Sequence, residues 1–92
     1  MQVLYVEDNI IDSDLAAREI SRQPGQFSLT TARTLQEARA ILQKNRQFDL
    51  ILVDLHLPDG NGLELLTEIR GANMPTAVVI LTSSGDEDSA VA

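Results

Sequence analysis

The chain has 92 residues, of which 43% are apolar, and it has no cysteine and a formal net charge of −7. Its length suits one domain with a single core, and the lack of cysteine excludes disulfides and cysteine-ligated metal sites. The negative charge argues against a segment that binds the nucleic-acid backbone. No apolar run approaches the roughly 20 residues of a membrane span, so we expect a cytoplasmic protein that does not enter membranes.

Short apolar runs alternate with amphipathic segments along the whole chain, which predicts strands and helices in turn. The apolar runs that predict strands are 3–6, 50–53 and 77–81, and the alternation of apolar and polar residues at 26–30 predicts a strand near an edge. The predicted helices cover 10–22, 34–45 with a capping-box signature at its start, 62–71, and a stub that begins at 86. This βαβαβαβ order predicts an α/β domain with a parallel sheet and helices on both faces.

Three of the predicted strands end on residues with oxygen-bearing side chains. The first leads into Glu7 and Asp8, the third into Asp54, and the fourth into Thr82. Right-handed crossovers and a common doubly wound order place the first strand between the second and the third, so that a crevice opens between the first and third strand ends. We therefore expect the three carboxylates to converge at this crevice.

Three carboxylates at one place repel one another, and a divalent cation would relieve that repulsion. Oxygen ligands without cysteine favour Mg²⁺, and such an ion suits phosphoryl transfer with Asp54 as a nucleophile and Thr82 as a hydrogen-bond donor. Each residue taken alone has a plain structural role. Asp54 suits a turn, Glu7 and Asp8 suit a solvated helix entry, and Thr82 suits a strand end.

Three segments, VLYVEDN, DLILVDLHLPDGNGLELL and PTAVVILTSSGDED, resemble the receiver domain of two-component response regulators in order and spacing. The resemblance implies a flavodoxin-like (CheY-like) doubly wound parallel sheet with strand order 2-1-3-4. It also implies that Asp54 is the phosphoacceptor and Thr82 the switch hydroxyl. Glu7, Asp8, Asp54 and the backbone carbonyl of His56 are then the Mg²⁺ ligands.

The function implied by the resemblance is that of a signalling switch. A histidine kinase or phosphotransfer protein would transfer a phosphoryl group to Asp54 in an Mg²⁺-dependent reaction. Such a domain is not an enzyme for an outside substrate, because it catalyses at most its own phosphorylation and dephosphorylation. An output domain beyond residue 92 could bind DNA, although this acidic segment is not expected to.

Some parts of the family pattern are missing from residues 1–92. The family carries a lysine after a fifth strand, an aromatic switch residue on that strand and a fifth helix, whereas the one lysine here, Lys44, belongs late in the second helix. Lys44 should lie at the opposite pole from Asp54. We therefore expect a receiver domain that is incomplete at its C-terminus. The strand at 77–81 would be an apolar edge that pairs with another segment or with a second copy of the chain.

Three other functions stay open. A receiver-like interaction module that works without phosphorylation is consistent with the missing lysine. An Mg²⁺ phosphohydrolase with an aspartate nucleophile would usually have a second carboxylate two residues on, and this chain has His56 there. A dinucleotide-binding domain is disfavoured, because the first strand leads into Glu7, Asp8 and Asn9 rather than a glycine-rich turn.

Overall fold

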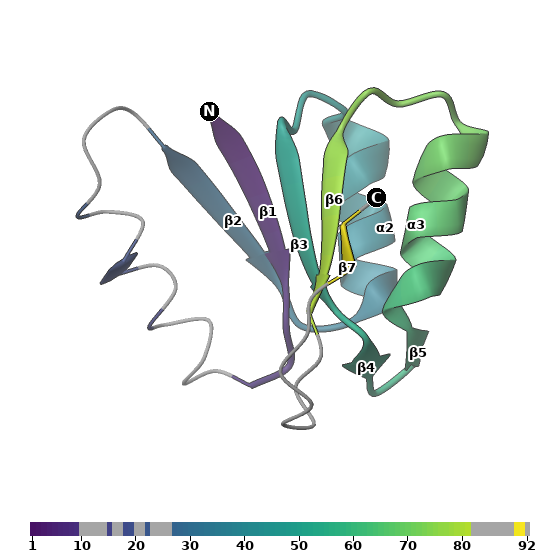
Figure 1. Ribbon diagram of the computed structural model, residues 1–92, viewed down its shortest axis with the longest axis horizontal. Coiled ribbons are helices and arrows are strands. Elements are labelled where there is room, and N and C mark those ends of the chain that lie inside the picture. Colours follow the sequence, from purple (N-terminus) through teal and green to yellow (C-terminus); the bar gives the residue numbers. More distant parts are fainter. Residues whose placement is uncertain (10–14, 16–17, 20–21, 23–26, 82–89, 92) are drawn as a thin grey trace.

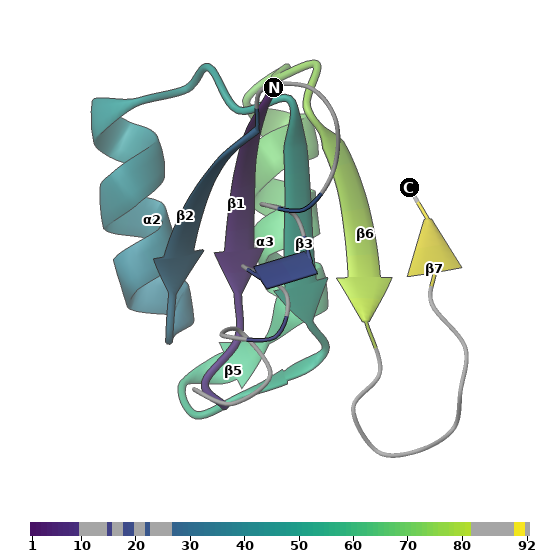
Figure 2. The same cartoon turned by 90° about the vertical axis from the view of Figure 1, so that its left-hand side faces the viewer.

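A computed structural model of the chain shows a twisted sheet with two helices packed against one face (Figures 1 and 2). The structure describes residues 1–9, 15, 18–19, 22, 27–81 and 90–91. The strands of the main sheet are β1 (Gln2–Val6), β2 (Ser28–Ala32), β3 (Leu50–Asp54), β6 (Ala77–Leu81) and β7 (Ala90–Val91). The other elements are α2 (Leu35–Lys44), α3 (Gly62–Gly71) and a small hairpin of β4 (His56–Leu57) and β5 (Gly60–Asn61).

The order of the main sheet is β2-β1-β3-β6-β7, and its first four strands are parallel. The predicted doubly wound order 2-1-3-4 is confirmed, with β6 as the fourth strand. In this register Val6 lies opposite Val53, and Asp54 lies opposite Leu81. The carboxyl ends of β1, β3 and β6 therefore meet at one edge of the sheet.

The core lies between the sheet and the two helices. Alternate residues of a strand point to the same face, so every second apolar residue of the central strands packs against α2 and α3. The strand residues of this core, each no more than 2% exposed, are Leu4, Val6, Ala32, Ile51, Val53, Val78 and Ile80. The helices add Leu35, Ala38, Leu42, Leu65 and Ile69. This apolar layer fixes the two helices relative to the strand ends.

Side-chain caps set the start of both helices. At α2 the Thr34 hydroxyl accepts a hydrogen bond from the Glu37 N–H at 3.0 Å, as the sequence predicts. The Glu37 carboxylate accepts from the Arg33 N–H at 3.2 Å, so the predicted reciprocal bond to Thr34 is replaced by one to its neighbour. At α3 the Asn61 side chain accepts from the Leu63 N–H at 2.8 Å.

Two of the predicted helices lie largely outside the described residues. Of the predicted helix at 10–22 the structure describes Leu15, Arg18 and Glu19, which are helical, and Arg22, which lies in a turn. The expected helical turn at 86–88 lies outside the described residues. The expectation that this helix continues toward the end of the chain is wrong, because Ala90–Val91 forms strand β7.

The β7 strand pairs antiparallel with β6, so that Val79 lies opposite Val91 and Ile80 opposite Ala90. The predicted bare edge at 77–81 is therefore partly covered by the chain's own residues. This pairing uses backbone groups that an edge strand otherwise leaves open. No helix within the described ranges is long and apolar enough to cross a membrane.

Candidate metal centre

An acidic cluster lies where β1 and β3 end side by side. Glu7 and Asp8 follow β1, Asp54 is the last residue of β3, and one carboxylate oxygen from each lies within 4.8 Å of the others. Glu7 is 5% exposed and Asp54 is 2% exposed, whereas Asp8 is exposed. The structure thus brings together the three carboxylates that the strand ends predict to converge, with two of them buried and the third at the rim.

Burial makes the negative charge of this cluster costly. It raises the pKa of Glu7 from 4.5 to about 7, and the neighbouring Asp54 carboxylate contributes to the increase. The Asn9 N–H, which donates to the Glu7 carboxylate at 3.1 Å, partly offsets this effect. Ionisation of the buried Glu7 carboxylate at neutral pH is therefore costly.

His56 lies beside the cluster through its backbone. Its N–H donates to Asp54 Oδ1 at 3.2 Å, and it begins the hairpin by pairing with Asn61. The residue is exposed. Thr82, the predicted switch hydroxyl, lies outside the described residues. The structure therefore places four of the five predicted site residues at this edge and gives no position for the fifth.

Lys44 lies at the other end of the molecule. It is the last residue of α2, and the side chain of the next residue, Asn45, donates to the Gln2 side chain at 3.1 Å. Gln2 begins β1, while the acidic cluster follows its end. Lys44 therefore sits at the pole opposite Asp54, as the sequence predicts, and is not near the cluster.

Gly62 also belongs to this site, although its place in the sequence predicts only the start of a helix. Its N–H donates to the Leu55 carbonyl at 2.8 Å, and a Cβ built on it would collide with the carbonyl oxygen of Asp54. Only glycine allows the start of α3 to pack this closely on the end of β3. A glycine at the first position of a helix that follows a strand-end aspartate is the signal that could have identified it.

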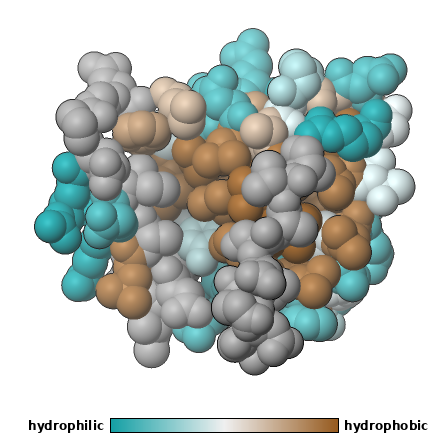
Figure 3. Space-filling view, viewed as in Figure 1, coloured by the Kyte–Doolittle hydropathy of each residue, from teal (hydrophilic) through white to brown (hydrophobic). Residues whose placement is uncertain are grey.

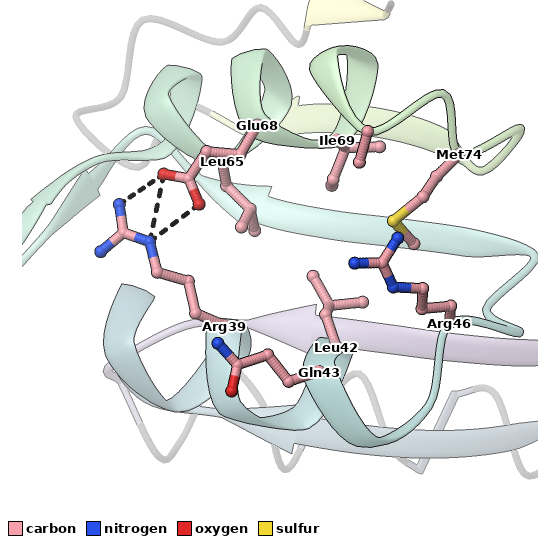
Figure 4. A pocket seen from close by; sticks show the side chains of 9 residues that line it. Arg39, Leu42, Gln43, Arg46, Leu65, Glu68, Ile69 and Met74 are labelled. Atoms are coloured by element: carbon pink, nitrogen blue, oxygen red, sulfur yellow. Dashed lines mark hydrogen bonds and ion pairs between the residues drawn. The ribbon is translucent and has the colours of Figure 1, made fainter.

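A separate groove lies between α2 and α3 (Figure 4). It has a volume of about 210 Å³ and is crossed by the Arg39 and Glu68 side chains, which form an ion pair at 2.6 Å. Its other lining residues are Leu42, Gln43, Arg46, Leu65, Ile69, Ala72 and Met74. None of these belongs to the acidic cluster, so the groove does not extend the candidate metal centre. In the space-filling view apolar surface gathers between the strands and the helices (Figure 3).

The donor atoms of the cluster fit a hard divalent cation. The converging side chains offer carboxylate oxygens without sulfur, which is the ligand type that Mg²⁺ and similar ions prefer. A bound cation would also neutralise the charge that burial makes costly. The cluster is therefore a potential metal site on the chemistry of its own residues.

Comparison with known proteins gives the family. A model of the response regulator receiver domain matches residues 3–92. The transcriptional regulatory protein MalR of Bacillus subtilis (strain 168) is 36% identical over 88 residues, which cover 96% of this chain and 37% of MalR. The MaeR response regulator bound to beryllium trifluoride matches with a TM-score of 0.80 and 26% identity, over 94% of this chain and 70% of that one.

The Mn²⁺-bound response regulator Rcp1 matches with a TM-score of 0.76 and 34% identity, over 95% of this chain and 68% of that one. The chain spans little more than a third of MalR, so these similarities describe one part of such regulators. Receiver domains of response regulators are signalling switches rather than enzymes in the usual sense. Because the family model matches almost the whole chain, this chain belongs to the response regulator receiver domain family.

Proposed function

We propose that this receiver domain is switched by phosphorylation of Asp54 in an Mg²⁺-dependent reaction. The observation that carries the proposal is the convergence of Glu7, Asp8 and Asp54, whose carboxylate oxygens lie within 4.8 Å of one another. Such a cluster is costly to maintain and becomes favourable once a cation binds to it. Residues 1–92 serve as the phosphoacceptor part of a longer regulator.

In the proposed reaction a carboxylate oxygen of Asp54 attacks the phosphorus of a phosphohistidine on the partner. A P–O bond forms as the P–N bond breaks, and the departing histidine nitrogen keeps the electron pair and takes up a proton. The product on this chain is an acyl phosphate. The strand pairing between β1 and β3 holds the attacking carboxylate next to Glu7, because Val6 and Val53 lie opposite each other.

The metal ligands in this proposal are the carboxylates of Glu7, Asp8 and Asp54 and the backbone carbonyl of His56. When bound, Mg²⁺ would offset the negative charge of the phosphoryl oxygens during transfer. Two relatives support the phosphoryl group and the metal ion of this proposal, since MaeR was solved with beryllium trifluoride and Rcp1 with Mn²⁺. Thr82 follows β6 in sequence and is the proposed hydroxyl that responds to the phosphoryl group.

The proposed partners are a histidine kinase or phosphotransfer protein, and an output domain in the same longer chain. Self-association through β6 is a further proposal, and it requires β7 to leave the edge that it covers at Val79 and Ile80. Light scattering that finds only monomers over a wide range of protein concentration would contradict self-association without affecting the phosphorylation proposal.

A thermal unfolding experiment with Mg²⁺ and beryllium fluoride tests the phosphorylation proposal. Beryllium trifluoride on an aspartate imitates an acyl phosphate, so the ligands should stabilise the wild-type chain. At a ligand concentration of 100 times Kd the gain is about 2.7 kcal/mol, which raises the Tm of a domain of this size by roughly 15 °C. Asp54→Asn removes the nucleophile's charge and should abolish the increase.

Asp49→Asn is the matched control, because it makes the same chemical change just before β3 instead of at its end. The control should keep the full increase in Tm. An increase that survives in Asp54→Asn, or no increase in the wild type, would contradict the proposal.

The position of Lys44 favours a second candidate function, an interaction module that works without phosphorylation. Lys44 is the one lysine of residues 1–92, and its place at the end of α2 means that it is not the lysine that the family resemblance implies beside Asp54. Mass spectrometry after incubation with acetyl phosphate and Mg²⁺ separates the two functions. The switch predicts a mass gain of one phosphoryl group on Asp54, whereas the interaction module predicts none.

A further inference from the structure

A single short hairpin, formed by β4 and β5 directly after Asp54, contacts the first turn of both helices. Asn61 at its end caps α3, where its side chain accepts from the Leu63 N–H at 2.8 Å. Asp59 at its turn reaches α2, which lies 24 residues earlier in the chain. Asp59 Oδ1 accepts from the Leu35 N–H at 2.9 Å, and Oδ2 accepts from the Gln36 N–H at 3.0 Å.

The turn of the hairpin also packs tightly against the start of α2. Gly60 has a φ of 154°, and a Cβ built on it would lie 2.8 Å from Leu35 Cδ1 and 2.8 Å from Glu64 Oε2. Leu35 itself is fully buried in the core. We call this contact of Asp59 and Gly60 with Leu35 and Gln36 the hairpin clamp. It holds the turn in place by two hydrogen bonds and by close packing.

The other end of the hairpin is bonded to the acidic cluster. The His56 N–H donates to Asp54 Oδ1 at 3.2 Å, and each strand of the hairpin is only two residues long. His56 pairs with Asn61, and Leu57 pairs with Gly60. Only the Leu57–Gly60 pair separates the His56–Asn61 pair from the turn, so a displacement of the His56 backbone also displaces the turn.

We infer that Asp59 is a positioning residue that couples metal binding at the acidic cluster to the first turn of α2. The inference rests on the proposed function, because it takes the His56 carbonyl and the Asp54 carboxylate as the groups that meet the ion. A cation bound to these groups would restrain the His56 backbone. The hairpin clamp would then hold the Leu35 and Gln36 N–H groups of α2 more firmly. Coupling between two sites is reciprocal. The factor by which metal binding stabilises the clamp is therefore the factor by which loss of the clamp weakens metal binding.

The charge of Asp59 suits this role. Two backbone N–H groups of α2 are otherwise without a helical acceptor, and an anion at a helix N-terminus interacts favourably with the helix dipole. The hydrogen bond from the Leu35 N–H is the main reason that the pKa of Asp59 lies below its usual value, with the Gln36 N–H acting in the same direction. The carboxylate is thus ionised in the clamp throughout the neutral range.

Amide hydrogen exchange of the whole chain, measured by NMR with and without Mg²⁺, tests the inference. Mg²⁺ should slow exchange at Leu35 and Gln36 in the wild type. Asp59→Ala should abolish this slowing and weaken Mg²⁺ binding about tenfold, the low end of the effect of residues that support metal ligands. Asp59→Asn keeps one of two acceptor oxygens and should give a smaller loss, which keeps the test open if the alanine variant does not fold.

Asp49→Ala is the matched control, because the exposed Asp49 side chain also accepts a backbone N–H, that of Gln2, at 2.8 Å. This variant should bind Mg²⁺ with wild-type affinity. Equal Mg²⁺ affinity in Asp59→Ala and the wild type, or exchange at Leu35 that ignores Mg²⁺, would overturn the inference and leave the proposed function standing. A wild-type chain that binds no Mg²⁺ would overturn both.

Discussion

Two aspartates mark the two ends of β3, and their surroundings differ. Asp49, just before the strand, is exposed, and its Oδ2 accepts the Gln2 N–H at 2.8 Å. Its backbone N–H donates to the Gln2 carbonyl at 2.8 Å, and its carbonyl accepts the Ala77 N–H at 3.2 Å. Gln2 is the first residue of β1, and Ala77 is the first residue of β6. The role of Asp49 is to join three strand starts.

Asp54, at the other end of the same strand, is 2% exposed and lies within 4.8 Å of two more carboxylates. Asp54 accepts a backbone N–H, that of His56, but its other neighbours are the carboxylates of Glu7 and Asp8. The difference between Asp49 and Asp54 shows that residue type does not mark the site. Burial together with clustering of like charges marks the site, because a bound ligand can offset the cost of such an arrangement.

The largest expected effect comes from the glycine that packs on Asp54. Gly62→Ala would put a Cβ against the Asp54 carbonyl oxygen and should lower the free energy of unfolding by about 3 kcal/mol, as overpacking does. Gly71, the last residue of the same helix, has nothing within 4 Å of a built Cβ. Gly71→Ala should therefore be neutral or stabilise by about 0.5 kcal/mol.

Urea denaturation monitored by circular dichroism measures both glycine variants. A Gly62→Ala chain as stable as the wild type would show that α3 can shift away from the end of β3. The inference that close packing at Gly62 fixes the position of Asp54 would then be wrong.

The sequence predicted the sheet and the acidic cluster well for physical reasons. The run at 50–53 is apolar without alternation, as suits a strand buried on both faces, and parallel strands bring their carboxyl ends to one edge. Once the strand order was inferred, the convergence of Glu7, Asp8 and Asp54 followed. The predicted bounds differ from the structure by a few residues, since Ser28–Ala32 begins and ends two residues later than the expected strand at 26–30.

The hairpin clamp and β7 could not be predicted in the same way. The bond between Asp59 and Leu35 joins residues 24 positions apart, and a local pattern carries no information about such a contact. Within the segment 56–61, Pro58 and Gly60 indicate a turn but not which helix the turn meets. The pairing of Val91 with Val79 likewise depends on the open edge of β6 rather than on its own sequence.

Glu7 gives a prediction of intermediate size at the Asp54 end. Its pKa rises from 4.5 to about 7 on folding, so its contribution to stability is fully present below pH 4.5 and is lost as the pH rises through about 7. Glu7→Gln imitates the protonated form. Without divalent cations the variant should be within about 1 kcal/mol of the wild type near pH 5 and more stable by on the order of 2–3 kcal/mol at pH 8.

Mg²⁺ should reverse this difference at pH 8, because it binds the ionised Glu7 carboxylate and stabilises only the wild type strongly. Thermal unfolding of both chains from pH 5 to pH 8, with and without Mg²⁺, measures the effect. Parallel stability curves without Mg²⁺ would show that Glu7 is ionised at little cost, and the electrostatic contrast between the two ends of β3 would lose its basis.

The smallest effect is expected at Asp49. Asp49→Asn keeps an acceptor oxygen for the Gln2 N–H, so the free energy of unfolding should fall by only about 0.5 kcal/mol. The five residues of β3 put Asp49 roughly 16 Å from Asp54, beyond the distance of about 8 Å over which charges interact strongly at physiological salt. Mg²⁺ affinity, measured by calorimetric titration, should therefore equal that of the wild type. If Asp49→Asn weakened Mg²⁺ binding, the losses in Asp54→Asn and Asp59→Ala would reflect the net charge of the whole chain, and no local site could be assigned from them.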